Sequence, residues 1–141
     1  ATAERSVTPP RAIPIEAPSE PAWVRGDALA LQQLFLNVLL NALEAVRDGG
    51  DVSVAVRPEH GHHVVEVADT GRGLSPEAAA HAFDPLFTTR DDGTGLGLTI
   101  AARLTHAHGG TIRIENAVGG GAVATIELPA ADLTGAAPPP L

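Results

Sequence analysis

The order of helical and strand-like periodicities along the chain constrains its fold most strongly. Apolar side chains recur at helical spacing over residues 28–48, and two segments then alternate apolar and polar residues, at 51–57 and 62–69. A short helical segment, a second long helical pattern and two more alternating segments follow at 75–83, 96–108, 111–116 and 122–129. Because the strands come in pairs and do not alternate singly with helices, this order favours an α+β two-layer sandwich, with a mixed, mostly antiparallel sheet and helices packed on one face.

The composition at the two ends limits the folded part. Residues 1–10 and the Ala/Pro-rich residues 131–141 have the composition of linkers, so we expect one domain over residues 11–130. The segments 11–18 and 23–27 are expected to be short edge strands or extended chain, since the prolines in this region exclude a central position in a sheet. The first residue is Ala rather than Met, so we expect the chain to be a piece of a longer protein whose upstream domain is absent.

The charge and the residue types exclude several classes of function. A formal net charge of -8 with 3% aromatic residues argues against nucleic acid as a partner. The absence of cysteine removes disulfides, thiol nucleophiles and cysteine zinc sites, and it fits the cytoplasm. No uncharged apolar run reaches the length of a membrane span, so we expect no direct membrane contact. All nine basic residues are arginines, which excludes a P-loop lysine.

The first helical pattern combines a broad apolar surface with a polar stripe. Asp27 is its expected N-cap, and its many leucine, valine and alanine residues predict a largely buried helix. Asn37 and Asn41 are four residues apart and therefore share one face. Their amides either bond to the neighbouring backbone or, because Mg²⁺ accepts amide oxygens, contribute to a metal site.

The stretch VADTGRG places Asp69 at the end of an alternating segment, followed by Gly71 and Gly73. A carboxylate at a strand end can accept a hydrogen bond from an exocyclic amine, and the glycines allow a flat ring to approach the backbone. An ordinary turn capped by aspartate has the same pattern. The stretch therefore indicates a ligand only in combination with other motifs.

Three glycines, Gly93, Gly95 and Gly97, open the second long helical pattern. Thr94 and Gly95 lie where the helix is expected to begin, so free backbone N–H groups and the positive end of the helix dipole would favour a phosphate there. Arg90 is the only basic residue near that end. A flexible loop with a glycine hinge is the alternative, and a lone glycine motif does not decide between them.

In combination and in this order, the motifs resemble a known family. NVLLNALEAV, DTGRG, FDPLFTTR, GTGLGL and GGGAVATIELP are similar to the N, G1, F, G2 and G3 boxes of the GHKL ATP-binding superfamily. Over residues 11–128 the chain resembles the catalytic and ATP-binding (HATPase) domain of bacterial sensor histidine kinases. NALEA and the short FTTRDDGTGLGL look most like the nitrogen-regulation and oxygen-sensing branch. The resemblance implies a Bergerat-type ATP-binding fold, with ATP or ADP and Mg²⁺ as cofactors.

The resemblance also implies roles for particular residues. Asn41 would coordinate the Mg²⁺ that bridges the phosphates, Asn37 would lie beside them, and Asp69 would accept the adenine amino group. Asn37, Asn41 and Arg90 are the implied catalytic residues. The remaining implied binding residues shape the adenine pocket or form a lid over the phosphates: Gly71, Gly73 and Leu74 for the pocket, and Phe83, Phe87, Arg90, Gly93, Thr94, Gly95, Leu96, Gly97 and Leu98 for the lid.

Departures from the family pattern refine these expectations. Ala122 and Ala124 occupy places in the G3 box that often hold Thr and Phe, so we expect no hydroxyl contact from this strand to adenine. The hydrolysing members of the superfamily carry a carboxylate one turn before the Mg²⁺ asparagine, where this chain has Asn37. An amide cannot accept a proton at neutral pH, so we expect phosphoryl transfer to a neutral histidine rather than hydrolysis.

The histidine that accepts the phosphoryl group is expected outside this chain. His62, His63, His106 and His108 are interpreted as surface or packing positions, and the family's phosphorylated histidine lies on a separate dimerising helical hairpin. The resemblance therefore implies two partners: the dimerisation and histidine-phosphotransfer domain of the parent kinase and, indirectly, the receiver domain of a response regulator. We expect a monomeric, cytoplasmic fragment, with a membrane anchor in the parent left open. Two alternatives remain, an anti-sigma-type protein serine kinase and a nucleotide-binding module without catalysis.

Overall fold

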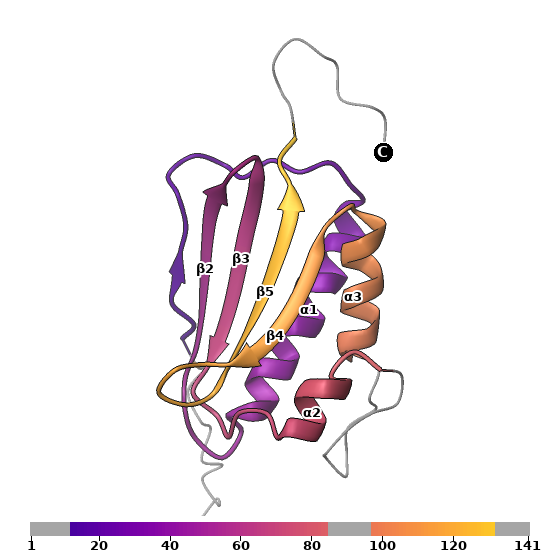
Figure 1. Cartoon of the computed structure of the whole chain (residues 1–141). Helices are drawn as coiled ribbons and strands as arrows, with labels where there is room; N and C mark the ends of the chain where they lie inside the picture. The colour runs from indigo at the N-terminus through magenta and orange to yellow at the C-terminus, as the bar shows by residue number, and fades with distance from the viewer. Residues whose placement is uncertain (1–11, 85–96, 132–141) are drawn as a thin grey trace, which may run out of the picture.

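The computed structural model describes residues 12–84 and 97–131 of the 141-residue chain. The helices and strands follow the order expected from the sequence (Figure 1). In chain order they are β1 (Ile15–Glu16), α1 (Ala28–Ala45), β2 (Val52–Glu59), β3 (His62–Asp69), α2 (Pro76–His81), α3 (Gly97–Ala107), β4 (Thr111–Asn116) and β5 (Ala122–Pro129).

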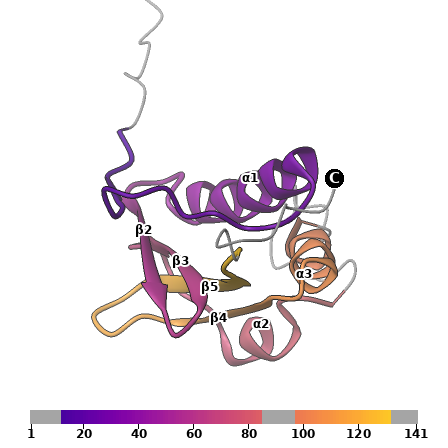
Figure 2. The same ribbon diagram turned by 90° about the horizontal axis from the view of Figure 1, so that it is seen from above.

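The strands form one mixed sheet in the order β1-β2-β3-β5-β4. Only β1 pairs in parallel, with β2, and the other three pairings are antiparallel. Helices α1 and α3 contact each other and cover one face of the sheet, as the view from above shows (Figure 2). The expected two-layer α+β architecture is confirmed.

Helix α1 differs from the sequence expectation in length and in burial. Asp27 caps its first turn by accepting a hydrogen bond from the N–H of Leu29 at 2.9 Å, but the helix ends at Ala45 and not at 48. Gly49 and Gly50 follow with φ of +130° and +124°, angles that a helix cannot continue.

The expectation of a largely buried α1 is wrong. Leu34, Val38 and Ala42 are buried in the core, while Leu36 and Leu40 are 49% and 52% exposed. The sheet and α3 cover only one side of the helix, so the leucines on the other side stay in contact with solvent. By length and composition alone α1 could cross a membrane, but its packing into the core cluster is that of the central helix of a sandwich.

The core fills the space between α1, α3 and the sheet. It consists of buried aliphatic side chains from both layers: Leu34, Val38, Ala42, Val46, Val52, Val65, Val67, Ala101, Ala124, Ile126 and Leu128. His108, just after α3, links the two helices at one end. It donates from Nδ1 to the carbonyl of Leu104 at 2.8 Å and accepts the N–H of Asp27 on Nε2 at 3.2 Å.

Candidate nucleotide-binding site

The ends of three neighbouring strands, β3, β5 and β4, lie side by side in one row at one end of the sheet. Asp69 is the last residue of β3 and pairs with Ala122, the first residue of β5. Ala122 pairs on its other side with Asn116, the last residue of β4. The row places a carboxylate and an amide, far apart in sequence, on neighbouring strands where the chain turns toward α1 and α2.

Asp69 is only 5% exposed, and its two carboxylate oxygens have different surroundings. Oδ1 accepts the backbone N–H groups of Gly71 at 2.9 Å and of Ala122 at 3.3 Å. Among the described residues, no hydrogen bond is recorded to Oδ2. The start of β5 thus contributes a backbone N–H to the carboxylate of Asp69.

The turn after β3 is fixed by contacts with the end of α1 at Gly71 and with the end of β4 at Leu74. A side chain at Gly71 would overlap the backbone carbonyl of Ala45 at the end of α1, so only glycine allows this approach. Gly73 has a φ of +74°, in the left-handed region that favours glycine. Asn116 then binds both backbone groups of Leu74, accepting its N–H at 2.6 Å and donating to its carbonyl at 3.1 Å.

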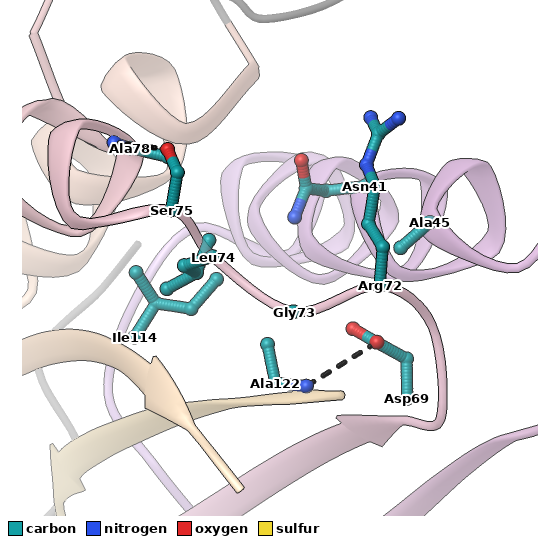
Figure 3. A pocket seen from close by; sticks show the side chains of 10 residues that line it. All are labelled: Asn41, Ala45, Asp69, Arg72, Gly73, Leu74, Ser75, Ala78, Ile114 and Ala122. Atoms are coloured by element: carbon teal, nitrogen blue, oxygen red, sulfur yellow. Dashed lines mark hydrogen bonds between the residues drawn. The ribbon is translucent and has the colours of Figure 1, made fainter. Parts of the chain in front are cut away.

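A cleft of about 400 Å³ opens between this turn, the second half of α1 and the ends of β4 and β5 (Figure 3). This volume is within the range of small-molecule binding sites. The lining residues are a mixture of apolar and polar side chains: Asn41, Ala45, Asp69, Arg72, Gly73, Leu74, Ser75, Ala78, Ile114 and Ala122.

The two asparagines of α1 have different positions. Asn41 lines the cleft opposite Asp69, and no hydrogen bond to its side chain is recorded in the described part of the chain. Asn37 lies one turn earlier and does not line the cleft. Its Oδ1 accepts a hydrogen bond from Nε2 of Gln33 at 2.6 Å, while its buried Nδ2 has no partner among residues 12–84 and 97–131.

The donors in this part of the chain suit a magnesium ion that arrives with its own oxygen ligands. Within the described ranges, no three His, Cys, Asp or Glu side chains are grouped closely enough to hold a metal. Mg²⁺ is commonly held by one or two protein oxygens together with substrate phosphates, and the unbonded amide of Asn41 provides such an oxygen. The residues present therefore fit a metal bound through a nucleotide.

The structure brings together only part of the set predicted from sequence. Asn41, Asp69, Gly73 and Leu74 line the cleft, and Gly71 fixes the turn behind it. Two further predicted residues, Gly97 and Leu98, start α3 and do not line the cleft. The carbonyl of Phe83 accepts a hydrogen bond from Thr99 at 2.8 Å, which ties the segment after α2 to α3. The other predicted lid residues lie outside the described residues: Phe87, Arg90, Gly93, Thr94, Gly95 and Leu96.

Sequence reasoning missed Arg72, Asn116 and the apolar wall of Ala45 and Ile114. The position of Arg72 between two glycines could have identified it as a site residue, because such a turn exposes the residue it contains. No local sequence pattern identifies Asn116 as a site residue. Its partner Leu74 is 42 residues away, and only the pairing of β4 with β5 reveals the contact.

Comparisons with known proteins show which family the chain resembles over most of its length. The model of the family described as histidine kinase-, DNA gyrase B-, and HSP90-like ATPase matches residues 26–132. Sensor histidine kinase ZraS of Klebsiella oxytoca is 43% identical over 122 residues, which cover 84% of this chain and 26% of that protein. This chain thus spans about a quarter of the length of the curated relatives it matches.

Solved structures give the same picture. The catalytic domain of histidine kinase ThkA is 31% identical, with a TM-score of 0.76, over 84% of this chain and 78% of that one. A structure of ThkA with the response regulator protein TrrA has a TM-score of 0.71 at 28% identity, over 84% of this chain and 34% of that one. Full-length ShkA in complex with AMPPNP is 35% identical, with a TM-score of 0.74, over 90% of this chain and 27% of that one.

Proposed function

The chain belongs to the histidine kinase-, DNA gyrase B-, and HSP90-like ATPase family and is the catalytic domain of a sensor histidine kinase. We propose that its cleft binds ATP with Mg²⁺ and that the domain transfers the γ-phosphoryl group to a histidine on the dimerisation domain of the parent kinase. The observation that carries the proposal is the hydrogen bonding of Asp69. Its Oδ1 accepts two backbone N–H groups, and its Oδ2 is left to accept a hydrogen bond from a ligand.

The adenine end of the ligand is set by Asp69. A purine 6-amino group donates a hydrogen bond to Oδ2, and the ring lies against the backbone at Gly73 and the apolar side chains of Ala45 and Ile114. A guanine base presents an oxygen at the same place, which the carboxylate repels. Because Asp69 is buried, an unpaired oxygen there is costly, and the cleft discriminates between the two bases.

The phosphate end lies toward α1. The amide oxygen of Asn41 is the protein ligand for Mg²⁺, which neutralises phosphate charge when bound. Asn37 offers a buried N–H₂ group one turn earlier and no base that could activate water. A neutral imidazole is already a nucleophile, so positioning suffices for transfer. Arg90 lies outside the described ranges, and the family resemblance implies that it neutralises phosphate charge.

The partners and the setting follow from the same proposal. The substrate is the dimerisation and histidine-phosphotransfer domain, which passes the phosphoryl group to a response regulator, as the ThkA complex with TrrA suggests. We assign the chain to the nitrogen-regulation and oxygen-sensing branch on the sequences NALEA and FTTRDDGTGLGL. We also place it in the cytoplasm, with a parent that is free to be membrane-anchored.

Calorimetric titration of the chain with ATP, ADP and GTP in the presence of Mg²⁺ tests the adenine assignment. We expect the chain to bind ATP and ADP and to bind GTP much more weakly. In Asp69→Asn the amide oxygen still accepts the two backbone N–H groups, so the fold survives, but ATP affinity falls by about 10–100-fold through loss of a charge-assisted hydrogen bond. Asp48→Asn, an exposed change near the end of α1, leaves ATP affinity unchanged.

Two results contradict the assignment. Equal affinity for ATP and GTP in the unaltered chain means that the 6-position is not recognised at Asp69. Unchanged ATP affinity in a folded Asp69→Asn variant means that the carboxylate does not contact the base.

A further inference from the structure

Among residues 12–84 and 97–131, Arg72 is the one cationic side chain that lines the cleft. It stands between Gly71 and Gly73, in the turn that follows β3. Figure 3 shows its side chain extending from this turn away from the carboxylate of Asp69, toward the side of the cleft where Asn41 lies. Its guanidinium therefore points away from the proposed adenine contact.

Within the described residues, the side chain of Arg72 forms no ion pair, whereas three other arginines do. Arg47, Arg57 and Arg113 each form an ion pair with a glutamate, for example Arg47 with Glu44 at 2.9 Å. No ion pair or hydrogen bond of the Arg72 side chain is recorded within residues 12–84 and 97–131. All of its guanidinium donors are thus available to a ligand.

The backbone around Arg72 is held in place without help from its own side chain. Gly71 donates its N–H to Asp69 and packs against the carbonyl of Ala45, where no other residue fits. On the other side, both backbone groups of Leu74 are bound by Asn116. The direction in which the Arg72 side chain leaves the turn is therefore set before any ligand arrives, which lowers the entropic cost of a contact.

We propose that Arg72 binds the phosphates of the nucleotide and makes the cleft select nucleoside di- and triphosphates over the bare nucleoside. The proposal rests on the proposed function, because a nucleotide with its base on Asp69 extends toward Asn41 and carries its anionic oxygens to the guanidinium. Arginine suits this task, since its planar fork of donors matches the geometry of phosphate oxygens. Arg47, which follows the end of α1, is paired with Glu44 and does not line the cleft.

Calorimetry with ADP and with adenosine, at low and high salt, tests this assignment. In Arg72→Ala, ADP affinity falls by about tenfold, the loss expected for one charge-assisted contact to phosphate, while adenosine affinity stays the same. The salt dependence of ADP binding also becomes shallower, because one phosphate contact is gone. Arg72→Lys keeps the positive charge but not the planar set of donors, so its ADP affinity should lie between those of Arg72→Ala and the unaltered chain. Arg103→Ala, an exposed change on α3 outside the cleft, serves as the matched control and binds like the unaltered chain.

The outcomes separate this inference from the function on which it rests. Unchanged ADP affinity in Arg72→Ala overturns the phosphate contact while the adenine site stands. An equal loss for ADP and adenosine also overturns it, since Arg72 would then act on the base. If the unaltered chain binds neither ligand, the nucleotide site itself is wrong and the role of Arg72 falls with it. Because Arg72 is exposed and its side chain forms no hydrogen bond within the described residues, the variants should fold, and thermal melting tests this.

Discussion

At the scale of single residues, the site depends on side chains whose hydrogen-bonding capacity is only partly used. One oxygen of Asp69 fixes the turn after β3, and the other is left for a ligand in a nearly solvent-free position. Asn41 has no recorded partner in the described part of the chain, although it lines the same cleft. Polar groups near a protein interior are normally paired, so groups left open on two walls of one cleft indicate a shared ligand.

The role of Asn41 leads to a prediction about metal dependence. Asn41→Ala should fold like the unaltered chain, because it removes no recorded internal hydrogen bond. ADP should bind to it with an affinity that no longer increases when Mg²⁺ is added, since the protein oxygen that holds the ion is absent. Titration with ADP in Mg²⁺ and in EDTA measures the difference, with exposed Gln32→Ala on the same helix as control. A Mg²⁺ effect equal to that of the unaltered chain would exclude Asn41 as a ligand.

At the scale of helices and strands, the periodicity of apolar residues was sufficient to predict the main elements. Alternation identified β2 to β5, and helical spacing identified α1 and α3. The strand order could not be predicted, because β3 pairs with β5 across more than 50 residues and no local pattern encodes that contact. For the same reason Asn116 was missed and the burial of α1 was overestimated: both depend on what another element covers.

The row of strand ends leads to a prediction about two glycines in the β4–β5 turn. Gly121 has a φ of +80°, and a side chain there would overlap the carbonyl oxygen of Asp69, whereas Gly119 has a φ of +93° and open space around it. Gly119→Ala costs only the backbone strain, about 1 kcal/mol of unfolding free energy. Gly121→Ala adds a steric clash that separates β5 from β3, for a total of about 3 kcal/mol or more.

Urea unfolding of both variants measures the difference, and ATP titration of Gly121→Ala should show weakened binding, because Asp69 loses its anchor at Ala122. If the two variants lose the same stability, the close approach of Gly121 to Asp69 is not a feature of the folded protein.

At the scale of the whole molecule, the sequence was sufficient to predict the fold and the family. The five motifs are all present in order, and the family model and the solved kinase domains confirm that the chain is a histidine kinase catalytic domain. Asn41, Asp69, Gly73 and Leu74 line one cleft, and their roles in binding ATP stay predictions. The predicted lid lies largely outside the described residues. A net charge of -8 on a domain that binds a polyanion gives each cation at the cleft added importance, because long-range electrostatics repel the ligand.

The central proposal is that this catalytic domain transfers the γ-phosphoryl group of ATP to a histidine on a separate dimerisation hairpin. Incubation with γ-labelled ATP and Mg²⁺, with and without the parent's dimerisation hairpin added as a separate chain, tests it most directly. Alone, the chain should become barely labelled and release phosphate very slowly, since Asn37 cannot activate water. With the hairpin, acid-labile label should appear on the hairpin's histidine, slowly because the two parts are not tethered. Rapid phosphate release without the hairpin would identify a hydrolase, and acid-stable label on a serine of a partner would identify a serine kinase; either result would contradict the account.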